Sequence, residues 1–352
     1  MNRKAKKIFH LVCPNGMGHF KRTVEIWSEL IDQMSVEVTI ACEDWQCQKF
    51  KNHRGFEKLQ NNPHVRFEFF DLNGTLRWSD LSNLQLNEYQ ATIERVKNHE
   101  QYEEADLIIS DNLLGLISSA KEALILGSFL WHDVLKESSG GGINEQVYQH
   151  EASLLENSKA KLVSVKDVTM PALQSCEENI RLAWFCKDVY DRPVQARENY
   201  KVLFSAGLSG ADTGALSALI SEFAYSPKYS IYLSPALAQK TNLEEESFAI
   251  FDFEEASFRS LDLMIARPGV GALTEAIKYQ IPMLAVDNGD NSEMLFNAIR
   301  LQQLGYGWDG ISRIPNRKEL ERDYQSKLLA LKTCKVDGFK DLEKIIKESL
   351  EI

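Results

Sequence analysis

The sequence predicts an α/β protein of two domains, each built around a parallel β-sheet. Short apolar runs recur along the chain and alternate with stretches of helical period, which is typical of parallel strands covered by helices on both faces. The same pattern starts again after Pro193. The length of 352 residues fits two domains of roughly 150 to 200 residues each.

The predicted strands fall into two series that begin alike. "KIFHLVCPNGMGHFKRTVEIWSEL" and "KVLFSAGLSGADTGALSALISEF" each read as a strand, a glycine-containing turn and a helix. The strands are predicted at Lys7–Cys13, Val36–Cys42, Val65–Phe70, Asp106–Ser110, Ser128–His132 and Lys161–Val165, and then at Lys201–Ala206, Ser230–Ser234, Ser247–Phe251, Leu261–Ala266 and Pro282–Asp287.

The two series predict two Rossmann-like domains, residues 1–190 and 191–335, joined near "KDVYDRPVQARENYK". A C-terminal helix at about 336–352 is expected to pack back on the first domain. Ligands of open α/β sheets bind at the carboxyl ends of the strands. We therefore expect a site in a cleft across which the two domains face each other.

Composition and charge exclude several classes of protein. A net charge of −11 argues against a broad basic surface for nucleic acid. No apolar run is long enough to span a bilayer, and the N-terminal stretch lacks the features of a signal peptide. The cysteines are scattered without a CxxC pair, so we expect reduced thiols and a cytoplasmic protein with at most peripheral membrane contact.

The first glycine-rich turn, Gly16-Met17-Gly18-His19, admits three interpretations. It can be a tight turn and nothing more, or a helix start whose exposed amides attract an anion. It can also be part of a dinucleotide fingerprint, with Glu43 or Asp44 as the acid that binds ribose. Lys21 then stands at the third glycine position, where it obstructs close helix–strand packing.

His19 is the candidate base of this turn. The positive end of the helix dipole disfavours the protonated imidazole, which leaves the ring able to take a proton from a hydroxyl. Asp111 ends the predicted strand of "DLIISD", and His132-Asp133 ends "GSFLWHD". Either acid could orient His19, and we prefer Asp111 because its strand is a plausible neighbour of the first. The alternative for His19 is a structural polar residue at a turn, and the alternative for His132 is a satisfied histidine at the edge of the sheet.

A second glycine-containing turn follows the strand "LDLMIA" in the second half. Arg267-Pro268-Gly269-Val270-Gly271 leads into a helix that carries Thr274 and Glu275 in its first turns. The glycines clear space for a phosphate against the backbone amides. Glu275 can accept both hydroxyls of a ribose, or it can simply complement the helix dipole.

These segments together resemble the two-domain GT-B glycosyltransferases, and within them the MurG-like UDP-sugar transferases. "NGMGHFKR", "FSAGLSGADTG" and "ARPGVGALTEA" stand in the family's order and at plausible spacing. "GMGHFKR" is also similar to the start of the UDP-sugar hydrolase of pseudaminic acid synthesis. The resemblance covers most of the chain in layout, but it is thin in motifs over residues 45–105.

The resemblance implies roles for individual residues. His19, oriented by Asp111, acts at the reacting hydroxyl, and Glu275 holds the ribose. The backbone of Phe251 meets the base edge, which suits uracil. The residues implied in phosphate or nucleotide binding are Gly16, Gly18, Ser205, Gly207, Gly210, Arg267, Gly269, Val270, Gly271 and Thr274.

The chain departs from the family in "DNGDNSEMLFNA", where MurG-like enzymes read the donor sugar with a histidine and a glutamine pair. Gly289 and Glu293-Met294 stand at those positions. A carboxylate accepts hydrogen bonds and cannot donate one, so the donor need not be an N-acetylhexosamine. Asp290, Asn291 and Glu293 are the candidates for sugar contact, with an ordinary polar loop as the alternative.

The sequence has no Asp-x-Asp triplet, which metal-dependent sugar transferases commonly use. We therefore expect no metal and no cofactor, with helix N-termini neutralising the diphosphate. The resemblance to MurG-like enzymes implies an inverting hexosyltransferase that uses a UDP-sugar donor and a carbohydrate, lipid-linked or small-molecule acceptor. A UDP-sugar hydrolase and a non-catalytic nucleotide-sugar binding subunit are the alternatives.

Overall fold

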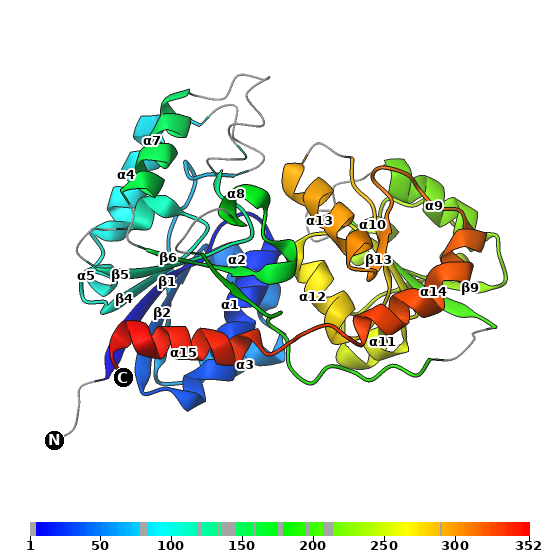
Figure 1. Ribbon diagram of the computed structural model, residues 1–352, viewed down its shortest axis with the longest axis horizontal. Helices are drawn as coiled ribbons and strands as arrows, with labels where there is room; N and C mark the ends of the chain where they lie inside the picture. The colour runs from blue at the N-terminus through cyan, green and yellow to red at the C-terminus, as the bar shows by residue number, and fades with distance from the viewer. Residues whose placement is uncertain are drawn as a thin grey trace. The chain divides into compact units, whose positions relative to one another are not determined.

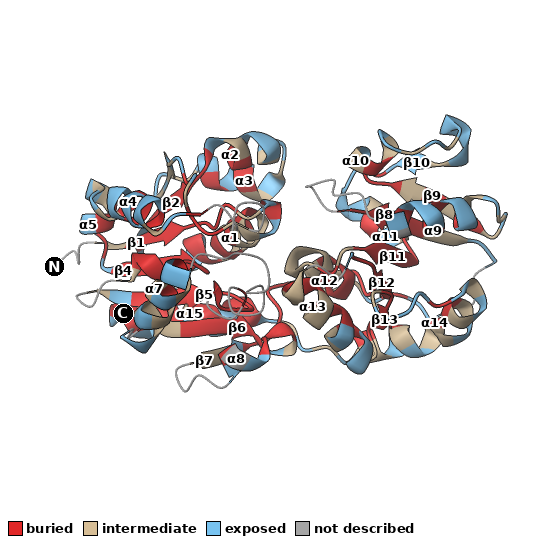
Figure 2. Cartoon of the chain, turned by 90° about the horizontal axis from the view of Figure 1, so that it is seen from above, coloured by how far each residue is buried: buried red, intermediate tan, exposed pale blue. Residues whose placement is uncertain are grey.

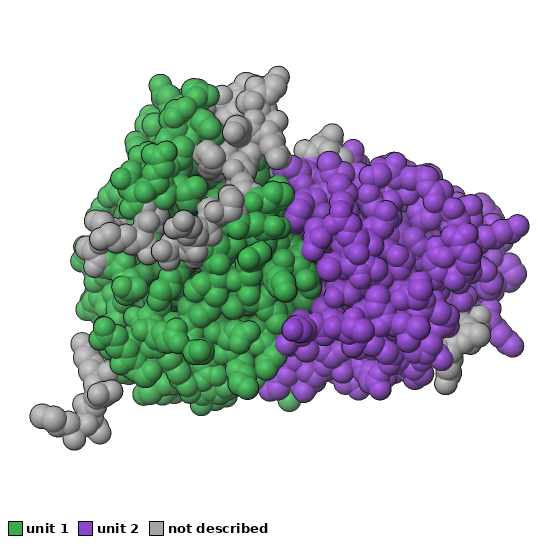
Figure 3. Space-filling model, in the orientation of Figure 1, with its two compact units in different colours: residues 1–185, 337–352 green, residues 186–336 purple. Residues whose placement is uncertain are grey.

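The computed structural model describes residues 5–77, 84–117, 121–131, 134, 145–157, 160–174, 179–194, 198–206, 214–288 and 291–352. The chain divides into two compact units, coloured green and purple in Figure 3. Unit 1 consists of residues 1–185 and 337–352, and unit 2 consists of residues 186–336. Each unit carries one sheet whose strands are all parallel.

The unit 1 sheet has the strand order β3-β2-β1-β4-β5-β6-β7. Its strands are β1 (Lys6–Leu11), β2 (Val36–Cys42), β3 (Val65–Phe69), β4 (Leu107–Asp111), β5 (Glu122–Leu126), β6 (Lys161–Val165) and β7 (Asn179–Leu182). The helices of unit 1 are α1 (Met17–Leu30), η1 (Ile31–Gln33), α2 (Asp44–Phe50), α3 (Arg54–Gln60), α4 (Leu86–Lys97), α5 (Glu100–Glu103), η2 (Leu114–Leu116), α7 (Glu145–Glu156), η4 (Lys166–Val168), α8 (Pro171–Gln174) and α15 (Gly338–Leu350).

The unit 2 sheet has the order β10-β9-β8-β11-β12-β13. Its strands are β8 (Tyr200–Ser205), β9 (Tyr229–Leu233), β10 (Ala249–Ile250), β11 (Leu263–Ala266), β12 (Met283–Ala285) and β13 (Gly307–Asp309). Its helices are α9 (Gly214–Ala224), α10 (Pro235–Ala238), η5 (Glu245–Ser247), α11 (Glu255–Ser260), α12 (Val270–Lys278), α13 (Ser292–Gln303) and α14 (Arg317–Leu331). The predicted α/β architecture of two Rossmann-like sheets is confirmed.

The order of each sheet reverses at one point, and ligands of open α/β sheets generally bind there, at the carboxyl ends of the strands. In unit 1 the reversal lies between β1 and β4, and in unit 2 it lies between β8 and β11. The central strands are almost wholly buried, as the red strands of Figure 2 show. A parallel sheet covered on both faces favours such continuous apolar strands.

The sequence prediction of a strand over Ser128–His132 is wrong. The fifth strand is β5, which ends at Leu126, and none of residues 128–131 belongs to a strand. The side chains of Phe129, Leu130 and Trp131 are nevertheless buried. An apolar segment buried in a loop produces the same pattern as a short strand, which explains the error. The prediction missed β7 and β13, which are short edge strands.

The last helix, α15, belongs to unit 1 although it follows unit 2 along the chain (Figure 1). It packs on α1 and β7 with one apolar face. The backbone N–H of Gly338 donates to the carbonyl of Trp184 at 3.0 Å, and Lys161 Nζ donates to Ser349 Oγ at 3.2 Å. The buried apolar residues of α15 are Phe339, Leu342, Ile345, Ile346 and Leu350. Among the described residues, no helix is long and apolar enough to cross a membrane.

A buried acid joins two helices of unit 1. The hydroxyl of Tyr89, on α4, donates to Glu151 Oε1, on α7, at 2.6 Å. Both side chains are fully buried. Burial raises the pKa of Glu151 from 4.5 to about 7, although the hydrogen bond from Tyr89 acts in the opposite direction. The carboxyl group is therefore protonated below neutral pH in the folded chain.

We predict that Glu151→Gln stabilises the protein increasingly as the pH rises. Above pH 4.5 the unfolded carboxyl ionises while the folded one holds its proton, so this group lowers the free energy of unfolding as the pH rises towards about 7. The rise in pKa corresponds to roughly 3 kcal/mol. Urea unfolding at pH 5 and pH 8 should therefore show a larger gain for the variant at pH 8.

Glu156→Gln is the matched control, because Glu156 is exposed on the same helix. A gain for Glu151→Gln that is equal at both pH values would contradict the prediction.

Candidate functional site

The β1–α1 turn lies at the reversal point of unit 1. Gly16 precedes α1 with a φ of 78°, a conformation that favours glycine. Gln46 clamps the turn from α2, because its Nε2 donates to the carbonyls of Cys13 at 3.2 Å and Gly16 at 3.4 Å. Among the described residues, a Cβ added at Gly16 or Gly18 would meet no atom within 4 Å. The helix start therefore faces open space, which suits the approach of a ligand.

His19 and Asp111 meet at this reversal point. His19 Nδ1 lies 3.0 Å from Asp111 Oδ2, and the side chain of His19 is 17% exposed while that of Asp111 is 0% exposed. The carboxylate can only accept a hydrogen bond, so Nδ1 carries the proton and Nε2 is the acceptor. The two residues thus form an oriented imidazole with its basic nitrogen on the side away from the acid.

Arg22 joins the pair, and sequence reasoning assigned it no role. Its Nη2 donates to Asp111 Oδ1 and lies 3.5 Å from His19 Nδ1. Burial alone would raise the pKa of Asp111, but the charge of Arg22 and the hydrogen bond from His19 outweigh it and hold that pKa well below its usual range. The signal was present in the sequence, because His19 and Arg22 are three residues apart and so share one face of a helix.

Asn112 directly follows the buried acid and is a second residue that the sequence did not single out. Its φ is 63°, in the left-handed region, and its N–H donates to the carbonyl of Leu126 at 2.9 Å. Its carboxamide is buried, and neither polar atom has a hydrogen-bond partner in the described part of the chain. A Cβ at Gly127 would lie 1.5 Å from Asn112 Oδ1. Strain and unpaired polar atoms of this kind concentrate at functional sites.

His10, on β1, is a structural histidine. It is fully buried, and burial lowers its pKa to about 4. The indole N–H of Trp27 donates to His10 Nδ1 at 2.9 Å, and Thr23 Oγ1 lies 3.5 Å from its Nε2. The ring is therefore neutral, and its hydrogen bonds help fix α1 against the sheet.

Glu43, the candidate ribose acid of the dinucleotide alternative, is committed to other groups. It accepts hydrogen bonds from Trp45 Nε1 at 2.6 Å, from the N–H of Leu72 at 3.3 Å and from Arg77. The carboxylate thereby holds the segment after β3 against the carboxyl end of β2. This occupancy disfavours the dinucleotide interpretation.

In unit 2 the turn after β11 lies beside the end of β8, at the second reversal point. Gly269 caps α12, which begins at Val270 and includes Gly271. Asn297 Nδ2, fully buried on α13, donates to the carbonyl of Pro268 at 2.9 Å and so fixes the turn. The amides of the helix start provide a site that favours anions.

The other predicted residues of this turn have identifiable contacts. Arg267 Nε donates to Asp287 Oδ1 at 2.5 Å, so its guanidinium is held by the acid that follows β12. Thr274 Oγ1 donates to the carbonyl of Val270 at 2.8 Å. Glu275 is buried on α12. Ser205 ends β8 and is buried, and its carbonyl accepts the N–H of Arg267 at 3.4 Å.

The predicted contacts of Phe251 with the base and of Asn291 with the sugar involve groups that already form hydrogen bonds within the protein. The N–H of Phe251 donates to the carbonyl of Leu233 at 2.8 Å, which removes it from the edge available to a base. Asn291 Oδ1 accepts the N–H of Met294 at 3.1 Å and caps α13, on which Glu293 is buried. Gly207, Gly210, Asp290 and the pair His132-Asp133 lie outside the described residues.

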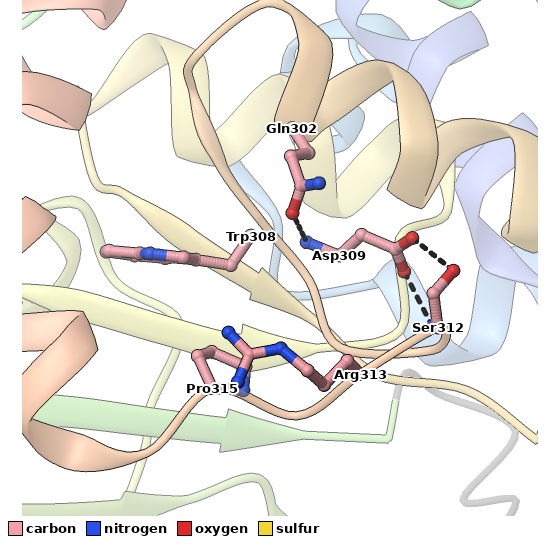
Figure 4. A pocket seen from close by; sticks show the side chains of 6 residues that line it. All are labelled: Gln302, Trp308, Asp309, Ser312, Arg313 and Pro315. Atoms are coloured by element: carbon pink, nitrogen blue, oxygen red, sulfur yellow. Dashed lines mark hydrogen bonds between the residues drawn. The ribbon is translucent and has the colours of Figure 1, made fainter.

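Two cavities lie away from these residues. One of about 520 Å³ opens at the amino ends of β1, β2 and β3. The other, of about 150 Å³, adjoins the edge strand β13 (Figure 4). Its lining residues are Gln302, Trp308, Asp309, Ser312, Arg313 and Pro315. Its charged groups are satisfied locally, because Ser312 donates to Asp309 and Arg313 pairs with Glu319.

The described residues contain no group of three His, Cys, Asp or Glu side chains that could hold a metal ion.

No family model matches the chain, and no curated protein matches it in sequence. Solved structures match it over nearly its whole length. VinC, a glycosyltransferase in complex with dTDP, is 15% identical, with 98% of this chain and 99% of that chain covered and a TM-score of 0.61. MurG of Acinetobacter baumannii is 13% identical, with 98% and 100% covered and a TM-score of 0.58.

UGT2 of Phytolacca americana, complexed with UDP-2-fluoro-glucose and pterostilbene, is 13% identical, with 99% of this chain and 100% of that chain covered and a TM-score of 0.66. The likeness to these structures shows the GT-B fold, and the expectation of that fold is confirmed.

We predict that Asp111→Asn lowers the free energy of unfolding at pH 7 by about 3 kcal/mol or more, because Arg22 loses a buried charged partner. The pKa of Asp111 is depressed in the folded chain, so its stabilisation is present above the ordinary value of 3.8 and is lost as the pH falls below it. Urea unfolding between pH 7 and pH 2 should show the two proteins converging in acid.

Asp106→Asn is the control, because Asp106 forms an exposed pair with Lys6 at 3.1 Å. Such pairs contribute about 1 kcal/mol or less. Wild-type and Asp111→Asn curves that stay parallel down to pH 2 would show that the pKa of Asp111 is the same in the folded and unfolded chain, which would contradict the prediction.

Proposed function

We propose that this protein is a glycosyltransferase that moves a sugar from a nucleotide-sugar donor to an acceptor hydroxyl. The observation that carries the proposal is the His19–Asp111 pair at the reversal point of unit 1, 3.0 Å apart, in a chain with the GT-B fold. A pair of this kind suits removal of a proton from a hydroxyl, because the acid fixes the ring and its tautomer.

In the proposed reaction, unit 1 binds the acceptor and unit 2 binds the donor. The acceptor oxygen attacks the anomeric carbon, the bond between that carbon and the diphosphate oxygen breaks, and the nucleoside diphosphate leaves. His19 Nε2 takes the proton of the attacking hydroxyl. Attack from the face opposite the leaving group inverts the anomeric centre.

The proposed donor site is the start of α12. The amides of residues 270–273 and the N-terminal end of the helix dipole favour the diphosphate, and Glu275 accepts the ribose hydroxyls. We propose a uridine nucleotide because the second-domain motif resembles that of UDP-sugar transferases, and a hexose as the transferred sugar. Because Phe251 N–H is engaged in the sheet, the base must be read by other groups of that segment.

We further propose that the reaction requires no divalent metal, since helix amides can neutralise the leaving diphosphate and the sequence has no Asp-x-Asp triplet. A cytoplasmic location is also proposed. It is supported by the five described cysteines, all of which are free thiols.

The experiment that tests the donor class is a thermal-shift screen of UDP, dTDP, ADP and NAD. A ligand that binds only the folded protein raises its stability, by about 2.7 kcal/mol at a hundredfold excess over its Kd. We expect UDP to raise the Tm by several degrees, with ADP and NAD giving no shift. A shift with NAD alone would contradict the proposal, and an equal shift with dTDP would widen the donor class.

We predict that His19→Ala lowers turnover by about a hundredfold or more, as expected for a lost general base, while the Kd for UDP stays unchanged. His64→Ala is the matched control, because His64 is exposed at the start of β3. Unchanged turnover in His19→Ala would remove His19 from the mechanism.

The same assay separates transfer from hydrolysis. Stoichiometric release of free sugar from a UDP-sugar without an acceptor indicates a hydrolase, in which His19 activates water. Binding of UDP with no turnover across an acceptor screen indicates a non-catalytic subunit.

A further inference from the structure

Arg22 and His19 share one buried carboxylate, that of Asp111. The two residues are three positions apart on α1, and both reach the end of β4. Arg22 Nη2 donates to Oδ1 of Asp111, while His19 Nδ1 lies 3.0 Å from Oδ2. The guanidinium nitrogen is itself 3.5 Å from the imidazole nitrogen. A permanent cation and a titratable ring therefore share one acid and touch each other.

The charges around the carboxylate can be assigned group by group. His10, on β1, is neutral because burial lowers its pKa to about 4. The thiol of Cys13, in the β1–α1 turn, is neutral because burial raises its pKa to about 12. The remaining groups are His19, Arg22 and Asp111. With a neutral imidazole, the cluster in the described residues carries one positive and one negative charge.

We propose that Arg22 is a positioning residue that holds Asp111 and keeps His19 free of a proton, so that the imidazole is available as a base. This inference rests on the proposed function. A buried carboxylate without a counter-charge favours the protonated form of a neighbouring imidazole, and a protonated imidazole cannot accept a proton. Arg22 supplies the counter-charge, because a guanidinium stays charged at every relevant pH.

The arrangement separates two tasks of the acid. Oδ2 orients the ring of His19 and selects the tautomer with its proton on Nδ1. Oδ1 is bound to Arg22, and the positive charge of Arg22 opposes the arrival of a second positive charge on His19. The acid can therefore direct the imidazole without drawing a proton onto it.

The test is the pH profile of kcat/KM for the full-length wild type, Arg22→Met, Arg22→Gln and Arg22→Lys with a UDP-sugar and an acceptor. We expect the acidic limb of the kcat/KM profile to move to higher pH by about one unit in Arg22→Met and Arg22→Gln. The loss of kcat/KM relative to wild type should therefore be about tenfold greater at pH 6 than at pH 9. Arg22→Lys keeps the positive charge, so its acidic limb should lie at the wild-type pH.

Two controls separate positioning from other roles. Lys58→Met removes a paired cation of α3 elsewhere in unit 1, 2.6 Å from Asp32, and should leave the profile unchanged. The Kd for UDP should be the same in every Arg22 variant. A loss of activity that is equal at all pH values would overturn the inference. Weaker UDP binding with an unchanged acidic limb would also overturn it, because that result indicates that Arg22 binds the phosphates of UDP.

A measurement without turnover keeps the inference separate from the proposed function. NMR titration of the His19 imidazole should show protonation at higher pH in Arg22→Gln than in wild type. Equal titration curves, together with an inactive His19→Ala, overturn the role of Arg22 and leave the proposed function standing. A titration curve that shifts in Arg22→Gln, together with a fully active His19→Ala, supports the role of Arg22 and overturns the proposed function. If Arg22→Met does not fold, Arg22→Gln and Arg22→Lys make the same comparison.

Discussion

The buried carboxylate of Asp111 is the constraint on which unit 1 depends. An isolated charge in a protein interior is very unfavourable, so its partners must be placed well. Both partners, His19 and Arg22, come from the first two turns of α1, and the rotation of that helix is therefore fixed by the acid. The positive φ of Gly16 and the hydrogen bonds from Gln46 set where the helix begins. Stability and the candidate chemistry thus rest on the same three side chains.

Unit 2 places its candidate residues at the equivalent point of its own sheet by other means. Its turn after β11 is held by hydrogen bonds and one ion pair: Asn297 binds the carbonyl of Pro268, and Arg267 binds Asp287. Because these contacts engage the side chains around the turn, the backbone amides at the start of α12 are the polar groups proposed to meet a ligand. One topology therefore supports two kinds of candidate site, an oriented imidazole in unit 1 and a helix start that favours anions in unit 2.

Much of this arrangement could be predicted because it follows from periodicity and strand ends. Alternating apolar runs gave the two parallel sheets, and the rule that strand ends share an edge brought His19 and Asp111 together. The partner of Arg22 could not be predicted, since a helix face is readable but the group that it meets depends on tertiary packing. The hydrogen bonds of the Phe251 N–H and of the Asn291 side chain could not be predicted for the same reason, because the sequence does not show which backbone groups these atoms already bind.

The return of α15 to unit 1 has a consequence for folding during translation. Unit 1 is interrupted by residues 186–336, so a ribosome synthesises all of unit 2 before unit 1 receives its last helix. At about 5–20 residues per second this interval lasts roughly 8 to 30 seconds. During that time the apolar surface of α1 and β7 that α15 later covers has no partner from its own chain. The unit that begins first is therefore completed last.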